Sequence, residues 1–250
     1  MRILYTFILC ISVCSMAWSQ KKDGRQNESY LNRHFYAIGN KDLEHRAYRK
    51  VTNELENGDQ VFWIFDGKNQ MVVQGKVEIN QAGLFKQETR EYLNEDGSIK
   101  NQTIKNLDNG RYATSFFENG QKKGQVIYLG DQSFTLWRES PESEKLKNRD
   151  DFKPSLDMER LQELFAQNLQ YPISPRRLGQ SGTVQIALLI SETGELIEIE
   201  PANAYGMNKE LVKEALRVIQ LYEGPFFPAL DLQGNPIEAW MYVPVRFKLG

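Results

Sequence analysis

Five two-residue turn signals between positions 57 and 120 constrain this chain more than any other feature. In each of them Asn or Asp precedes Gly: Asn57-Gly58, Asp66-Gly67, Asp96-Gly97, Asn109-Gly110 and Asn119-Gly120. Such dipeptides tolerate the positive φ angles of tight hairpin turns. Because aromatic and β-branched residues fill the stretches between them, the sequence predicts a β-rich domain of consecutive hairpins over residues 21–138.

Several of these turns follow an aromatic residue, which suggests a degenerate repeat. The run from Phe117 to Gly124, Phe-Glu-Asn-Gly-Gln-Lys-Lys-Gly, is similar to antitoxin-type relatives of the MORN repeat, which form ribbons of hairpins. The alternative is an unrelated meander whose aromatic residues pack against each other. Neither interpretation places catalytic chemistry in this domain.

The first residues are typical of an export signal. An apolar run from Ile3 to Trp18 is shorter than the roughly 20 residues that a membrane-spanning helix needs, and small residues near its end allow cleavage by signal peptidase. We therefore expect a signal peptide over residues 1–20 and a periplasmic location. The alternative is an uncleaved membrane anchor at residues 3–18. Cys10 and Cys14 both lie in this run, so a cleaved product would contain no disulfide.

The charge balance excludes one class of partner. Lys and Arg total 31 against 33 for Asp and Glu, so no net field attracts nucleic acid or an anionic membrane surface. Residues 139–154 are polar and lack a compact apolar run, which predicts a flexible linker between two domains.

Residues 155–250 are predicted to form an α+β domain. Apolar residues recur at helical spacing over 156–169 and 211–219, with Asn208 as an N-cap of the second helix. Alternation predicts a hairpin over 183–200 and a last strand over 237–248. Two helices would then cover one face of a three-stranded antiparallel sheet, in which the first strand is central and the last strand is an edge.

Seven short motifs in this region occur in the order and spacing of one family. They are Gln170-Tyr171-Pro172, the run from Leu178 to Ile186, Gly194-Glu195-Leu196, the run from Glu214 to Val218, Phe227-Pro228-Ala229, the run from Gly234 to Ile237, and the run from Pro244 to Phe247. Together they resemble the C-terminal domain of TonB. The resemblance extends over most of the span from Leu156 to Gly250.

The resemblance implies a periplasmic module that binds the N-terminal box peptide of outer-membrane receptors as an extra β-strand. In the family this contact involves the Gln-Tyr-Pro segment and the last strand, which correspond here to Gln170, Tyr171 and the edge that begins at Ile237. Pro244 has no N–H, so it is expected to face away from the neighbouring strand. Trp240, Tyr242 and Arg246 would then direct their backbone groups to the open edge, and we assign them to the partner-binding site.

The resemblance also implies that the module passes force from the inner membrane, and two departures from the family pattern affect this part of the function. Energy transducers that resemble TonB carry a membrane anchor with a motor-facing histidine and a long Pro-rich spacer. Here His34 and His45 lie outside the apolar run, and the region after the run is predicted to be a folded domain instead of a spacer. The alternative function is therefore a cell-envelope interaction or scaffold protein that uses the domain for docking. An outer-membrane receptor or another envelope protein is the expected partner.

An enzymatic function is not expected. With two histidines, each predicted to be a packing or surface residue, the sequence contains no evident nucleophile and base. Asp150-Asp151 is placed in the linker and Glu198 with Glu200 on a solvent face. We therefore expect no catalytic residue, no metal and no cofactor.

Overall fold

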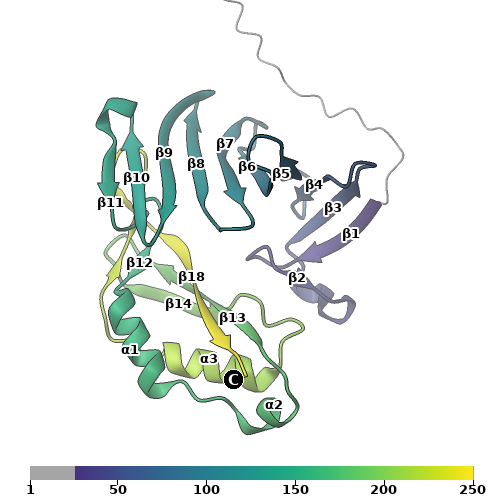
Figure 1. The fold of residues 1–250 in the computed structure, drawn as a ribbon, viewed down its shortest axis with the longest axis vertical. Helices are drawn as coiled ribbons and strands as arrows, with labels where there is room; N and C mark the ends of the chain where they lie inside the picture. Colours follow the sequence, from purple (N-terminus) through teal and green to yellow (C-terminus); the bar gives the residue numbers. More distant parts are fainter. Residues whose placement is uncertain (1–25, 250) are drawn as a thin grey trace, which may run out of the picture.

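The computed structural model describes residues 26–249, so the predicted signal peptide lies outside the described residues. The N-terminal part forms one antiparallel sheet of 11 strands in the order β11-β10-β9-β8-β7-β6-β5-β4-β3-β1-β2 (Figure 1). Its strands are β1 (Gln26–Leu31), β2 (Ala37–Ile38), β3 (Tyr48–Glu54), β4 (Gln60–Phe65), β5 (Met71–Asn80), β6 (Phe85–Leu93), β7 (Ile99–Asn106), β8 (Tyr112–Glu118), β9 (Gln121–Gly130), β10 (Ser133–Arg138) and β11 (Lys145–Lys147). A short 3-10 helix, η1 (Asn40–His45), lies between β2 and β3.

Tight turns connect neighbouring strands of this sheet. Asn119 and Gly120 join β8 to β9 with φ angles of 50° and 73°, the left-handed backbone that a two-residue hairpin turn requires. At the Asp66-Gly67 signal the positive φ belongs instead to Asn69, at 62°. The signal thus marks the correct hairpin, although the residue that adopts the strained conformation is two positions further on.

The sheet buries a small apolar cluster near its N-terminal end. Leu31, Phe62, Ile64 and Val73 form its centre, and Phe35, Tyr48 and Tyr92 are among the residues that pack around it. These side chains lie on the face of the sheet that is turned toward the C-terminal domain, which we call the inner face. Phe35 stacks on Tyr48 with ring centroids 4.3 Å apart.

Residues 139–154 differ from the flexible linker that the sequence predicts. They include a second 3-10 helix, η2 (Pro141–Ser143), and strand β11, which pairs with β10. Asp150 and Asp151 are buried, at 7% and 5% exposure, rather than solvent-facing. Asp150 pairs with Lys153 at 3.1 Å, and Asp151 pairs with Arg149 at 3.0 Å. The polar composition of this segment suggested a solvated linker. In the fold, however, these charged side chains pair with each other and the two aspartates are buried.

The C-terminal part combines helices with antiparallel strands, an α+β arrangement. Its main elements are α1 (Met158–Asn168), α2 (Ile173–Arg177), β13 (Gly182–Ile190), β14 (Leu196–Pro201), α3 (Lys209–Ile219) and β18 (Ala239–Phe247). The three long strands form a sheet in the order β14-β13-β18. Two small strand pairs accompany it, β12 (Ser155–Leu156) with β15 (Phe226–Phe227) and β16 (Ala229–Leu230) with β17 (Pro236–Ile237).

One apolar core joins the sheet to its helices. Side chains of β13 and β18 with alternating sequence positions, such as Val184, Ile186 and Val245, are fully buried against α1 and α3. The side chain of Asp157 caps α1 by accepting from the N–H groups of Glu159 and Arg160. Asn208 caps α3 in the same way.

The short helix α2 was not expected from the sequence. Tyr171-Pro172 does end the preceding helix, since α1 stops at Asn168, but the chain turns helical again at Ile173. Pro172 is the N-cap of α2, where its fixed φ of −59° suits the start of a helix. The domain therefore carries three helices rather than the two that were expected.

Candidate functional site

Strand β18 forms one edge of the three-stranded sheet. It pairs with β13 along its whole length without a bulge, and Pro244 stands opposite Gln185. On its other side no strand of the described chain pairs with it. The backbone groups on that side are therefore placed to bond an added strand.

Hydrogen bonds of Gln185 define which backbone groups of β18 face this open edge. The N–H of Gln185 donates to Asn203 Oδ1 at 2.8 Å, and its carbonyl accepts from the N–H of Ala202 at 2.7 Å. Both groups thus point toward the β14 side and away from β18. In an antiparallel pair, two residues that stand opposite each other either both direct their backbone groups at the partner strand or both direct them away from it. Because Gln185 directs its groups away from β18, Pro244 directs its carbonyl away from β13, to the open edge. Trp240, Tyr242 and Arg246 follow the same parity.

The side chains of β18 divide between two faces of the sheet. Val243, Val245 and Phe247 are buried in the core with α1 and α3. Trp240, Tyr242, Pro244 and Arg246 occupy the opposite face, which we call the outer face of the sheet.

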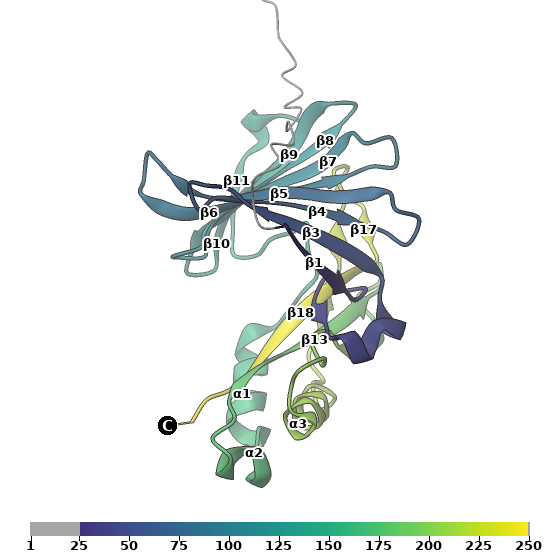
Figure 2. The same cartoon turned by 90° about the vertical axis from the view of Figure 1, so that its right-hand side faces the viewer.

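The outer face is partly covered by residues 32–36, which connect β1 to β2 and which we call the β1–β2 loop (Figure 2). His34 is 6% exposed and packs edge-on against Trp240, with ring centroids 4.8 Å apart. Its Nδ1 lies 3.1 Å from the hydroxyl of Tyr242. The side chains of Trp240 and Tyr242, assigned to partner binding from the sequence, are therefore in contact with the N-terminal part of the same chain.

Charged groups strengthen this contact on strand β14. Arg33 pairs with Glu200 at 2.5 Å and also with Glu198, while His34 Nε2 bonds to Glu200. The amide of Asn32 donates to the carbonyl of Ala202 at 2.7 Å. The two glutamates thus contact the β1–β2 loop and are only partly exposed, whereas the alternation of the strand suggested a solvent face.

The pKa values of Glu200 and Tyr242 are shifted in this contact. Burial alone would raise the pKa of Glu200, but the bonds from Arg33 and His34 outweigh burial and lower it below the usual carboxyl value. Burial raises the pKa of Tyr242 to about 12. At neutral pH the contact therefore combines an ionised carboxylate with a neutral phenol.

Gln170 and Tyr171 lie at the other end of β18. The ring of Tyr171 packs edge-on against Phe247 with centroids 5.6 Å apart, and its hydroxyl donates to the carbonyl of Gln180. The N–H of Gln170 donates to Glu214 Oε1 at 2.8 Å. Gln170 itself is exposed, and within residues 26–249 its side chain makes no hydrogen bond.

Arg246 occupies the same end of the strand. It is exposed, and no carboxylate of the described residues lies within 4.0 Å of its guanidinium. The five residues assigned from the sequence thus fall into two groups. Gln170, Tyr171 and Arg246 lie at the C-terminal end of β18, whereas Trp240 and Tyr242 contact His34 of the β1–β2 loop.

Sequence reasoning missed the contribution of Asn32 and Arg33. The sequence contained only an indirect indication of this contact. Glu198 and Glu200 lie on one face of a strand, where their neighbouring negative charges require a cation or water to balance them. This indication could not have identified Arg33 as that cation, since the ion pair with Glu200 joins residues far apart in the chain.

Residues 26–249 contain no group of three His, Cys, Asp or Glu side chains that could hold a metal ion. Within the same residues, no helix has the length and apolar character needed to cross a bilayer.

Comparison with known protein families gave one match. Residues 167–249 match the family described as Gram-negative bacterial TonB protein C-terminal. The resemblance inferred from the seven motifs is thereby confirmed for this segment, which contains β18 and all five assigned residues. Comparisons with curated proteins and with solved structures gave no match. The likeness of the hairpins to MORN-repeat relatives stays a prediction.

Proposed function

We propose that this chain is a non-catalytic, TonB-like protein of the cell envelope that binds partner proteins by accepting a β-strand along β18. The main support for this proposal is the open edge of β18, where unpaired backbone N–H and C=O groups are available to bond an added strand. The family match over residues 167–249 supports an envelope role. Outer-membrane receptors that take part in transport are the proposed partners.

The contacts around β18 suggest where an added strand would begin. Gln170 and Arg246 are exposed at the C-terminal end of the strand, while the β1–β2 loop occupies the side chains of Trp240 and Tyr242 at the other end. A bound peptide would therefore pair first beside Arg246 and extend toward Tyr242. Pro244 interrupts the row of donors between them, which discourages pairing with unrelated strand edges.

A scaffold or docking protein without energy transduction is the second candidate. The observation that favours it is the direct packing of the N-terminal sheet on the C-terminal domain through Asn32, Arg33 and His34. A domain held in this way is not carried on an extended tether. The two candidates differ at the N-terminus, where a mature protein that begins near Gln20 would exclude a direct link to an inner-membrane motor.

Substitutions in β18 test strand addition. The probe is a synthetic peptide with the N-terminal sequence of an outer-membrane receptor from the same genome, and its binding to the full chain is measured by calorimetry. Arg246→Pro removes an outward N–H, so we expect at least about fivefold weaker binding with unchanged folding. Arg246→Ala keeps that N–H and serves as the matched control for loss of the side chain.

The opposite register position provides a second control. Val245→Pro removes an N–H that bonds β13, so it should unfold the C-terminal domain instead of merely weakening binding. Strand addition at β18 is excluded if Arg246→Pro and Arg246→Ala bind the peptide equally well. It is also excluded if the parent chain fails to bind the receptor peptide.

A further inference from the structure

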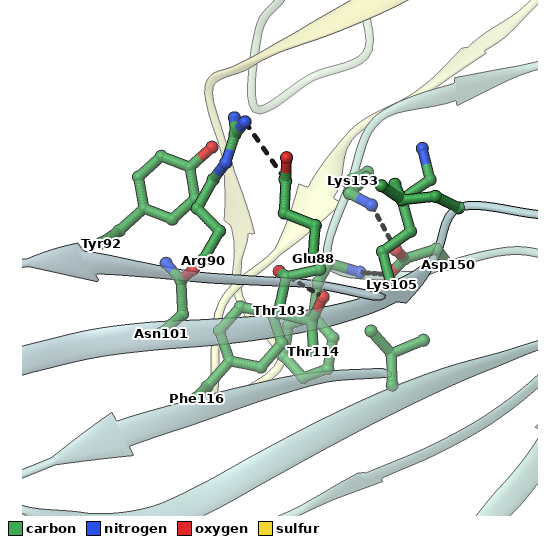
Figure 3. A pocket seen from close by; sticks show the side chains of 13 residues that line it. Glu88, Arg90, Tyr92, Asn101, Thr103, Lys105, Thr114, Phe116, Asp150 and Lys153 are labelled. Carbon is green, nitrogen blue, oxygen red and sulfur yellow. Dashed lines mark hydrogen bonds and ion pairs between the residues drawn. The ribbon is translucent and has the colours of Figure 1, made fainter. Parts of the chain in front are cut away.

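A cavity of about 550 Å³ lies on the inner face of the N-terminal sheet (Figure 3). Strands β6, β7 and β8 form its floor, and Asp150, Phe152 and Lys153 close one side. Its volume is in the range of small-molecule sites, which frequently occur where two parts of a protein meet. None of the five residues assigned to strand addition lines it, so it is a separate feature of the molecule.

Charged side chains of both signs line the cavity. Figure 3 shows Arg90 near Tyr92 and Asn101, Lys105 near Asp150 and Lys153, and Glu88 between these two groups. Arg90 pairs with Glu88 at 3.1 Å, and Lys153 pairs with Asp150 at 3.1 Å. Both carboxylates therefore already have a cationic partner.

Among the cations that line the cavity, Lys105 has no carboxylate partner in the described chain. In the strand register it stands opposite Glu88, but Glu88 bonds to Arg90. No carboxylate of residues 26–249 lies within 4.0 Å of the Lys105 ammonium group. The lining of the cavity consequently carries one positive charge in excess.

The hydrogen-bonding capacity that remains in the cavity consists mainly of donors. The Lys105 ammonium and the Asn101 amide form no side-chain hydrogen bond within the described chain. Arg90 has five N–H donors; its Nη2 pairs with Glu88, and its buried Nε has no hydrogen-bond partner among the described residues. The hydroxyls of Thr103 and Thr114 bond to each other at 2.9 Å. A ligand that offers acceptors and a negative charge would complement these groups.

Aromatic side chains supply the apolar part of the lining. Phe116 and Phe152 lie with ring centroids 4.1 Å apart, and the guanidinium of Arg138 lies 4.3 Å from the centroid of Phe152. The two rings thus pack on each other, and the apolar surface that they leave to the cavity, beside an excess positive charge, suits a planar apolar group that carries an anion.

We infer that this cavity binds a small organic anion, one in which a carboxylate or similar group contacts Lys105 and Arg90 while a planar apolar group packs against Phe116 and Phe152. The site is independent of strand addition at β18. It would give the N-terminal domain a ligand of its own, so that the molecule combines a small-molecule site with a protein-binding edge.

Binding of phenylacetate to the full chain, measured by calorimetry, tests the inference. Phenylacetamide has nearly the same shape but no charge and is the matched neutral probe. We expect phenylacetate to bind with a Kd of about 1 mM or tighter and phenylacetamide to bind at least about tenfold more weakly. Equal binding of the two probes, or no binding of phenylacetate up to about 10 mM, would overturn the inference.

Charge substitutions separate this cavity from other sites on the protein. Lys105→Gln should weaken phenylacetate binding about tenfold, Lys105→Arg should retain most of it, and Glu88→Gln should strengthen it by removing a negative charge. Lys68→Gln, in the exposed turn between β4 and β5, is the control and should change nothing. Unaltered binding by Lys105→Gln, or weaker binding by Glu88→Gln, would contradict a site in this cavity.

Discussion

At the scale of single residues, Gly75 shows how tightly the inner face of the sheet is packed. A Cβ atom at this position would lie 2.3 Å from Phe62 Cζ and 2.6 Å from the carbonyl oxygen of Thr89. Phe62 is 2% exposed and has the Lys50 ammonium 4.4 Å from its ring centroid, so it has little room to move. The absence of a side chain at Gly75 is thus what allows Phe62 to lie across β5.

Gly75→Ala should therefore destabilise the N-terminal sheet, by about 1–3 kcal/mol, because the added methyl group overpacks a buried contact. Urea unfolding of the full chain measures the change. Gly67→Ala is the matched control, since Gly67 has nothing within 4 Å of its Cβ position and no positive φ. If both substitutions leave the unfolding midpoint unchanged, the close contact between Phe62 and Gly75 does not affect the free energy of unfolding.

At the scale of elements, the β1–β2 loop and strand β14 form the contact that joins the two halves of the molecule. The lowered pKa of Glu200 reports that its ionised form is stabilised by Arg33 and His34. A carboxyl group whose folded-state pKa is depressed stabilises the fold above its unfolded-state pKa, near 4.3 for glutamate. That stabilisation is lost as the pH falls through the folded-state pKa.

We expect the melting temperature of the full chain to fall more steeply from about pH 6 to about pH 3 than that of Glu200→Gln. At neutral pH the substitution should cost about 1 kcal/mol, because Arg33 and Glu200 itself are partly exposed. Differential scanning calorimetry provides the measurement. Glu192→Gln, on an exposed turn, is the control that should keep the pH dependence of the parent. Parallel pH curves for the parent and Glu200→Gln would refute this role of the carboxylate.

At the scale of the whole molecule, the two halves have separate apolar cores. The C-terminal core extends from Leu156 to Phe247 and includes no residue of the N-terminal sheet. The N-terminal cluster around Phe62 includes no residue of the C-terminal part. Contacts between the halves are mainly polar or aromatic, as at His34 with Trp240 and at Arg138 with the carbonyl of Asp231.

A fragment of residues 152–250 should therefore fold on its own. It should be less stable than the same domain in the full chain, since Trp240 loses the cover of His34 and Arg33. Its amide spectrum would show dispersed signals, and 5-fluorotryptophan at Trp240 would give a fluorine signal shifted from its position in the full chain. Broad, collapsed amide signals would show that the C-terminal core needs the N-terminal sheet.

Local patterns were sufficient for much of this architecture. The Asn-Gly and Asp-Gly dipeptides predicted the hairpins because the need for positive φ depends on the turn residues themselves. Alternation in β18 predicted which side chains enter the core, and Pro244, which lacks an N–H, indicated the register found through Gln185. These features depend on residues that are neighbours in sequence or in one strand pair, so periodicity reveals them.

Contacts between distant segments were decided by the tertiary structure alone. The polar segment 139–154 becomes ordered because buried Asp150 and Asp151 meet Lys153, Arg149 and Lys147, and no composition rule distinguishes this from a linker. Trp240 and Tyr242 are in contact with the N-terminal part because the β1–β2 loop packs on their face of the sheet, although Tyr242 stays 41% exposed. Strand periodicity determines which face a side chain occupies, whereas the surface that meets this face depends on how the two halves of the chain pack together.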